Sequence, residues 1–310
     1  MQSAVLTSRL APTDRVAVAN LVARAESSRG YRPVSDQFWL DLHAPTPPLV
    51  SVRVFDLDDR LAAYAQSTLA SDEWTIESVA ASDGHVAGQA LADAIEATLG
   101  VIAEIGGSSV TWLVQGPTVL HESIAASHSL AVGRQLHQMR RSLPVGLSFD
   151  IETRSFDPER DIDPWVAING RAFAWNPEQG NWTANSVRAR MSEPWFDPDG
   201  FLIHDRDGQM AGFCWTKVHA DAEPVLGEIY VIAVDPDFHG LGLGRDLTLA
   251  GLDHLAGAGI ATAMLFVDAD NVAAIRVYDR LGFVIHRTDT LFTGNLSTVA
   301  LSPEALSTDS

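Results

Sequence analysis

The sequence has very little cysteine and very little lysine. Cys214 is the only cysteine among 310 residues, so no disulfide can form within the chain. Disulfide-free chains are typical of reducing compartments, and we therefore expect a cytoplasmic protein. Lys217 is the only lysine among 21 basic residues, and this preference for arginine is typical of a GC-rich genome.

Long apolar runs and excess positive charge are also missing. No apolar run reaches the roughly 20 residues of a membrane helix, and the first residues lack the pattern of a secretion signal. We expect neither a membrane span nor export. With 40 acidic residues the net charge is −19, which repels phosphate backbones, so we predict no nucleic-acid partner. The ten histidines show no metal-ligand spacing, and we predict no metal.

The chain contains two copies of one pattern. The strand LAAYAQ (61–66) corresponds to MAGFCW (210–215), and TWLV (111–114) corresponds to MLFV (264–267). A strand glutamate recurs as Glu77 and Glu228. Pro144 and Gly146 interrupt the pattern between the copies. We therefore predict an N-terminal domain over 1–143, a C-terminal domain over 151–301 and a flexible tail over 302–310.

The second copy has clear local structure. A hairpin is expected to turn at Asp207-Gly208, and the continuous apolar run 228–234 predicts a central strand covered on both faces. Leucines at helical spacing predict a helix that begins near Gly244 and ends at Gly257 and Gly259.

A glycine-rich loop connects that central strand to that helix. Glycines at 240, 242 and 244 let the backbone adopt positive φ and come close to a ligand. Successive N–H groups at the positive end of a helix dipole suit a pyrophosphate. The alternative interpretation is an ordinary glycine-rich turn between a strand and a helix. The loop is not a nucleotide P-loop motif, because it lacks the Lys-Ser/Thr ending.

A second motif, DNVAAIRVYDRLGF, covers residues 270–283. Asn271 is predicted to cap a helix and Gly282 to end it. Tyr278 lies two turns beyond Asn271 on the same face. Taken alone, Tyr278 could equally be a buried aromatic residue whose hydroxyl is bonded to the backbone.

These two motifs together resemble the GNAT N-acetyltransferase superfamily. HGLGLG (239–244) is similar to its pyrophosphate loop, although His239 stands where Gln or Arg is usual, and residues 270–283 are similar to its second signature. The resemblance implies an α+β fold of two tandem domains, each a mostly antiparallel mixed sheet flanked by helices, and acetyl-CoA as co-substrate. The residues it implies around acetyl-CoA are Ile232, Ala233, Val234, His239, Gly240, Leu241, Gly242, Leu243, Gly244, Arg245, Asn271, Val272, Ala273, Ala274, Ile275 and Arg276.

Acetyl transfer from a thioester requires a base, an electrophilic N–H and an acid. Glu228 is our candidate base, acting through a water, although a glutamate at a strand end can also be a plain surface residue. A free N–H at Ala233 or Val234 would polarise the carbonyl. Tyr278 is the candidate acid that protonates the departing thiolate.

The two-copy arrangement resembles a tandem branch of the superfamily, found in actinobacteria, that acetylates the cysteinyl amine of desacetylmycothiol (Cys-GlcN-inositol). Nearly the whole chain follows this plan. The resemblance implies a monomeric enzyme with a small-molecule acceptor. The residues it implies around the acceptor are Asp36, Glu178, Lys217, Glu228 and Phe266, the last replacing a usual tyrosine. A lysine at the end of a strand can also simply be solvated.

The N-terminal copy departs further from the family pattern. In GHVAG (84–88) Val86 replaces the middle glycine, and SIAASHSLAVGRQL carries no tyrosine for the acid position. We expect no catalysis there. Two other functions stay open: a GNAT enzyme for a peptide N-terminus, polyamine or antibiotic amine, and a non-catalytic regulator that binds acyl-CoA.

Overall fold

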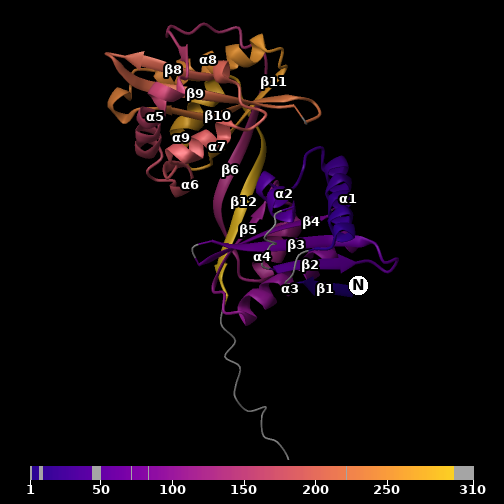
Figure 1. Ribbon diagram of the computed structural model, residues 1–310. Coiled ribbons are helices and arrows are strands. Elements are labelled where there is room, and N and C mark those ends of the chain that lie inside the picture. The colour runs from indigo at the N-terminus through magenta and orange to yellow at the C-terminus, as the bar shows by residue number, and fades with distance from the viewer. Residues whose placement is uncertain are drawn as a thin grey trace, which may run out of the picture. The chain divides into compact units, whose positions relative to one another are not determined.

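The structure is a computed structural model that describes residues 2–6, 10–43, 50–70, 72–82, 84–220 and 222–296 (Figure 1). Side chains are not described for residues 2–6 or at Asp36, Leu40, His43, Pro177 and Glu178. The predicted tail, 302–310, lies outside the described residues.

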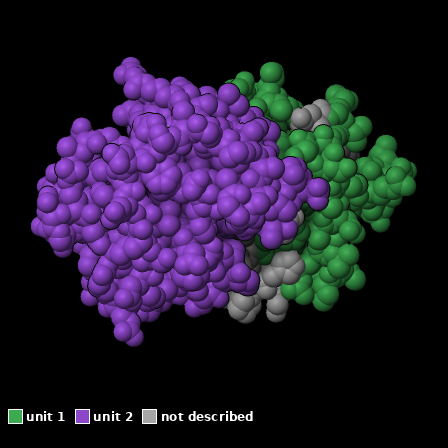
Figure 2. Space-filling model, turned by 90° about the horizontal axis from the view of Figure 1, so that it is seen from above, with its two compact units in different colours: residues 1–135, 287–310 green, residues 136–286 purple. Residues whose placement is uncertain are grey.

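The chain forms two compact units (Figure 2). Unit 1 comprises residues 1–135 and 287–310, and unit 2 comprises residues 136–286. This division differs from the domains predicted at 1–143 and 151–301, because two strands cross between the units. Strand β6 (Ala131–Ser142) begins in unit 1 and pairs with β11 of unit 2, whereas β12 (Val284–Asn295) begins in unit 2 and pairs with β5 of unit 1. Each copy of the pattern thus gives its last strand to the other unit.

Unit 1 is a mixed sheet in the order β1-β2-β3-β4-β5-β12, in which only the β4–β5 pair is parallel among these neighbours. Its other elements are β1 (Gln2–Leu6), α1 (Pro12–Arg29), α2 (Asp36–His43), β2 (Val50–Phe55), β3 (Leu61–Ala70), β4 (Glu73–Ala80), α3 (His85–Glu104), β5 (Ser109–Val114) and α4 (Val119–Ser127).

Helix α3 is the one helix of the described part that is long and apolar enough to cross a membrane. One side of it is buried in the core of unit 1, with Leu91, Ile95 and Ile102 packed among the sheet residues Val52, Ile76 and others. A half-buried apolar helix of this kind is typical of a protein core.

Unit 2 repeats the plan with the order β6-β11-β10-β9-β8-β7, and again only one pair, β10–β11, is parallel. Its elements are β7 (Arg154–Ser155), α5 (Pro158–Ala172), α6 (Pro177–Gly180), α7 (Ala184–Met191), the 3₁₀ turn η1 (Pro198–Gly200), β8 (Phe201–Arg206), β9 (Gln209–His219), β10 (Leu226–Val234), the 3₁₀ turn η2 (Pro236–Phe238), α8 (Leu243–Gly257), β11 (Thr262–Asp268) and α9 (Val272–Arg280). The predicted α+β fold of two tandem mixed sheets is confirmed.

The central strand β10 is covered on both faces, as its apolar run predicts. On one face Ile229 packs with leucines of α8 and with Leu281 and Phe283 beyond α9. On the other face Val231 and Ala233 pack in an aromatic core around Trp165 of α5 and Trp215 of β9. The predicted hairpin is also confirmed, since Asp207 and Gly208 both have positive φ between β8 and β9.

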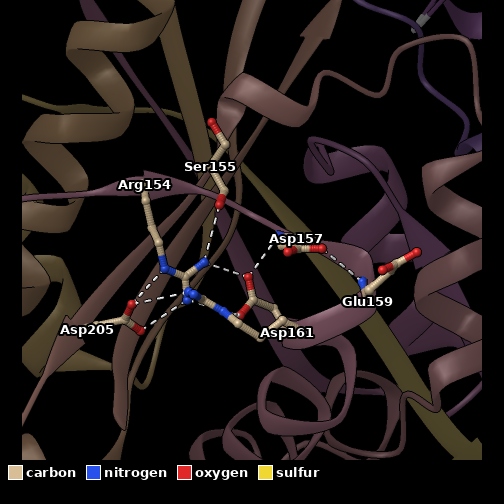
Figure 3. Close-up of polar contacts among 7 residues, drawn as sticks. Arg154, Ser155, Asp157, Glu159, Asp161 and Asp205 are labelled. Carbon is tan, nitrogen blue, oxygen red and sulfur yellow. Dashed lines mark hydrogen bonds and ion pairs between the residues drawn. The ribbon is translucent and has the colours of Figure 1, made fainter. Parts of the chain in front are cut away.

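The start of α5 is fixed by a network of charged side chains (Figure 3). Arg154 of β7 contacts both oxygens of buried Asp161, at 2.6 and 3.0 Å, and both oxygens of Asp205 at the end of β8, at 2.6 and 3.1 Å. Asp161 also accepts from the Asp157 amide at 2.8 Å and from Arg160 at 3.1 Å. Burial alone would raise the pKa of Asp161, but these hydrogen bonds outweigh it and hold the pKa below its usual value.

We expect Asp161→Asn to lower the free energy of unfolding at pH 7 by about 2–3 kcal/mol, because Arg154 keeps its charge and loses a bidentate partner. The lowered pKa means that Asp161 stabilises the folded state above its unfolded pKa of about 3.9, and that this stabilisation disappears as the pH falls through the folded value. Urea unfolding should therefore show a difference in the free energy of unfolding between the wild type and Asp161→Asn that is smaller at pH 3 than at pH 7. Asp163→Asn, on the exposed side of the same helix, is the control and should change stability by no more than about 0.5 kcal/mol. Equal stability of the two variants would contradict this role.

Candidate active site

Strand β10 separates from β11 half-way along its length. The two strands pair only from Gly227–Ala263 to Ile229–Leu265, whereas β10 stays paired with β9 as far as Val234. A bulge at Tyr230 shifts the β9–β10 register at the same point. The equivalent β3–β4 pairing in unit 1 runs without a shift. The last five residues of β10, 230–234, are thus left without a ladder partner on the β11 side.

Strand alternation decides which amides face this gap. The Asp235 N–H donates to the Ala211 carbonyl of β9 at 2.9 Å, so the backbone groups of Ala233 also point toward β9. Those of Ile232 and Val234 point the opposite way. Of the two candidate electrophilic amides, that of Val234 therefore faces the gap, and that of Ala233 faces β9.

The loop after β10 contains the left-handed glycines that the sequence motif predicts. Gly240 and Gly242 have φ of +83° and +80°, a left-handed conformation that disfavours any side chain. A Cβ built on either glycine meets no atom within 4 Å, so their outer side is open. Gly242 is the N-cap of α8, whose first amides lack acceptors within the helix. We call residues 239–245 the cradle; the start of α8 gives it a partial positive charge that favours an anion.

An ion pair that the sequence does not reveal supports the cradle. The buried carboxylate of Asp235 accepts a hydrogen bond from the Asp237 amide at 3.1 Å and forms an ion pair with Arg171 of α5. Arg171 also reaches Asp237 at 3.3 Å. The guanidinium neutralises two carboxylates that would otherwise repel a phosphate group. Since 64 residues separate Arg171 and Asp235, no local pattern predicts this contact.

The predicted residues around the cradle are mostly accessible. Leu241, Arg245 and Val272 are exposed, and Leu243 is buried in the core. His239 contacts the Val234 carbonyl at 3.1 Å, so its ring reaches back to the end of β10. Arg245 pairs with Asp246 at 2.5 Å and contacts the Ser148 carbonyl at 3.3 Å.

Helix α9 begins and ends as the second motif predicts. The Asn271 side chain accepts from the Ala274 amide at 3.1 Å, and Gly282 has φ of +81° just after the helix. Ala273 and Arg276 are exposed, and Ile275 is partly buried. Tyr278 is 8% exposed and packs on Phe283 with ring centroids 5.8 Å apart. Burial, and to a lesser extent the neighbouring Cys214 thiol, raise the pKa of Tyr278 well above its usual value near 10, so the hydroxyl holds its proton at neutral pH.

Glu228 lies at the start of β10, before the bulge, and is 7% exposed. Its Oε2 contacts Nε2 of His219, the last residue of β9, at 2.7 Å. The recurring glutamate of unit 1, Glu77, has other partners. The Ser35 amide donates to Glu77 Oε2 at 3.0 Å, and the Ser35 hydroxyl donates to Oε1 at 2.7 Å. Burial raises the pKa of Glu77. The two glutamates therefore share a position in the fold but not a set of partners.

Three of the five predicted acceptor residues share one face of the unit 2 sheet. Lys217 lies directly opposite Glu228 across the β9–β10 pair, and Met264 lies beside Glu228 in β11. Phe266, two residues along β11, is on the same side and is 36% exposed. Lys217 Nζ lies over the rings of Trp195 and Tyr230, at 5.0 and 5.5 Å from their centroids. We call Lys217, His219, Glu228, Met264 and Phe266 the acceptor face.

The remaining two acceptor predictions cannot be placed with the others. The side chains of Asp36, the first residue of α2, and Glu178, in α6, lie outside the described part of the chain. In unit 1, Gly84 caps α3 with φ of −67°, so the backbone there lacks the left-handed turn that Gly242 makes before α8. No three potential metal-ligating side chains gather among the described residues.

The central strand that separates from its neighbour, the glycine-rich loop at a helix start and the tyrosine on the next helix are the features that the resemblance to GNAT N-acetyltransferases predicts. The family model "Acetyltransferase (GNAT) family" matches residues 169–283. A GCN5-related N-acetyltransferase from Sphaerobacter thermophilus has the same fold, with a TM-score of 0.70 over 94% of this chain and 95% of that one, at 19% identity.

Two curated relatives narrow the class. Mycothiol acetyltransferase of Thermobispora bispora is 38% identical over 92% of this chain and 97% of its own length. Mycothiol acetyltransferase of Streptomyces griseus is 40% identical over 89% of this chain and 90% of its own. The chain belongs to the mycothiol acetyltransferase family of tandem GNAT enzymes, and the resemblance expected from the sequence is confirmed.

Proposed function

We propose that this protein transfers the acetyl group of acetyl-CoA to the cysteinyl amine of desacetylmycothiol, which yields mycothiol and CoA in the last step of mycothiol biosynthesis. Family membership over nine-tenths of the chain supports the acceptor. The observation that supports the co-substrate is the cradle, in which two left-handed glycines, Gly240 and Gly242, stand open to solvent at the start of α8.

In this proposal the acceptor's ammonium first loses a proton to Glu228 through a water, and the neutral amine then attacks the thioester carbonyl. A C–N bond forms and the C–S bond breaks. The Val234 N–H binds the carbonyl oxygen as negative charge develops on it. Tyr278, whose raised pKa keeps it protonated, gives its proton to the CoA thiolate, and the second proton that the nitrogen loses on becoming an amide returns to the tyrosinate through water.

The acceptor face supplies contacts suited to a small sugar thiol. The ammonium of Lys217 can donate to hydroxyl oxygens, and Phe266 of β11 offers an exposed apolar ring on the same face of the sheet. The same proposal includes a monomer in the cytoplasm with no nucleic-acid or membrane partner. The −19 charge disfavours anionic surfaces, and buried Cys214, whose pKa burial raises to about 12, is an unreactive thiol.

Mixing the purified protein with acetyl-CoA and desacetylmycothiol, and following CoA release, tests the proposal. We expect turnover that saturates with the thiol, whereas peptides, polyamines and aminoglycosides should give rates at least about 100-fold lower. Faster turnover with one of those amines would assign another acceptor. Tight acetyl-CoA binding with no turnover on any amine would indicate a regulator.

A further inference from the structure

We infer that His219 is a positioning residue that holds the Glu228 carboxylate in the orientation of a base. The inference rests on the proposed function, because it assigns His219 a part in the same acetyl transfer. His219 is absent from the two sequence motifs, and its relation to Glu228 appears only when β9 and β10 are paired.

The geometry places the histidine diagonally across the strand pair from the glutamate. Leu226 of β10 lies opposite His219, and Glu228 lies opposite Lys217, so His219 is the diagonal neighbour of Glu228 on the same face. Nε2 of His219 and Oε2 of Glu228 are 2.7 Å apart, a short contact for a nitrogen and a carboxylate oxygen. The side chains are 21% and 9% exposed, so the pair is sheltered but within reach of water.

The contact leaves the two carboxylate oxygens with different tasks. An imidazole that carries its proton on Nε2 donates to Oε2, whether the ring is neutral or cationic. Oε2 is then occupied, and Oε1 is the oxygen that accepts the acceptor's proton. A glutamate has three rotatable bonds, and fixing them before the substrate arrives removes an entropic cost from the chemical step.

This assignment gives Lys217 and His219, the two basic residues next to Glu228 on β9, different functions. Lys217, directly opposite, has its ammonium over the rings of Trp195 and Tyr230, on the side of the aromatic core. His219 contacts the carboxylate itself. Loss of Lys217 should therefore weaken acceptor binding and appear in KM, whereas loss of His219 should slow the chemical step and appear in kcat.

The test compares His219→Ala and His219→Gln with the wild type, using desacetylmycothiol as acceptor. Glutamine places an amide N–H close to the position of Nε2, so it keeps the donor without the ring. We expect His219→Ala to lower kcat about tenfold to 100-fold, with KM for acetyl-CoA within about twofold of the wild type, and His219→Gln to recover most of the loss. An unchanged kcat in His219→Ala, or a glutamine variant as slow as the alanine variant, would overturn the inference.

His254 supplies a matched control. Its Nε2 contacts Asp197 Oδ2 at 3.0 Å and its side chain is 22% exposed, so it forms a similar pair in the same unit away from the acceptor face. His254→Ala should keep the wild-type kcat, and an equal loss in both alanine variants would reduce His219 to a structural role.

A second measurement works without turnover. Nitrogen-15 NMR of labelled histidine should show His219 protonated at Nε2, with a signal that changes in Glu228→Gln and not in Asp197→Asn. If the wild type does not acetylate desacetylmycothiol, the proposed function fails while this result still decides whether His219 holds Glu228. A signal insensitive to Glu228→Gln overturns the inference whatever the substrate.

Discussion

Gly242→Val should abolish measurable acetyl-CoA binding at micromolar concentrations, which we expect as a rise in Kd of about 100-fold or more. Two effects combine. Gly242 has φ of +80°, which costs a β-branched residue about 1–2 kcal/mol or distorts the loop. The new side chain also adds bulk at the N-cap of α8, where we propose that the diphosphate binds. A loss of about 2.7 kcal/mol corresponds to the 100-fold change.

Isothermal titration of acetyl-CoA measures this effect, and Gly259→Val separates ligand contact from backbone strain. Gly259 follows the other end of α8, has φ of +81° and is equally free of neighbours. Its valine variant should lose comparable stability but bind acetyl-CoA with the wild-type Kd. Normal binding by Gly242→Val would show that the cradle does not hold the diphosphate.

Tyr278→Phe should lower kcat by about 100-fold to 10,000-fold and leave the Kd of acetyl-CoA within about twofold. The phenylalanine keeps the ring contact with Phe283 and the packing of α9, so only the proton donor is removed. The CoA thiolate must then take its proton from water, which enters this buried position poorly. Single-turnover measurements with saturating acceptor detect the chemical step directly.

Tyr64→Phe is the matched control for that variant. Tyr64 is fully buried in β3 of unit 1, its hydroxyl donates to Gln66 at 3.2 Å, and burial raises its pKa as well. Its phenylalanine variant should lose about 1 kcal/mol of stability and keep the wild-type kcat. Comparable loss of kcat in both variants, or full activity in Tyr278→Phe, would remove Tyr278 as the acid.

Local features of the fold could be predicted from the sequence because each depends on residues close together in the chain. The Asp207-Gly208 turn, the Asn271 cap and the end of α8 near Gly257 all follow from backbone preferences over a few residues. The cradle was predictable for the same reason: its glycines, its helix start and its preceding strand are consecutive. The predictions that Glu228, Tyr278 and the acceptor residues act on substrate stay predictions.

Features that depend on strand register or on distant contacts could not be predicted. The bulge at Tyr230 is invisible in an apolar run, and it decides that Val234 rather than Ala233 presents its amide to the gap. His219 reaches Glu228 only through the register of two strands, and Arg171 reaches Asp235 from another element. The exchange of β6 and β12 between the two units could not be predicted either. A sequence repeat shows where each copy begins, but it does not show which sheet the last strand of a copy joins.

Because of that exchange, the sheet of unit 1 can be completed only after β12 has been translated. A nascent chain that has emerged as far as β5 displays Trp112 and its neighbours on an open strand edge, because the partner strand, β12, is translated only after all the elements of unit 2. At about 5–20 residues per second the ribosome leaves this edge uncovered for roughly ten seconds or longer. The β5 edge of the amino-terminal half therefore stays without this partner until β12 has been translated, and a fragment that ends after residue 143 lacks that strand.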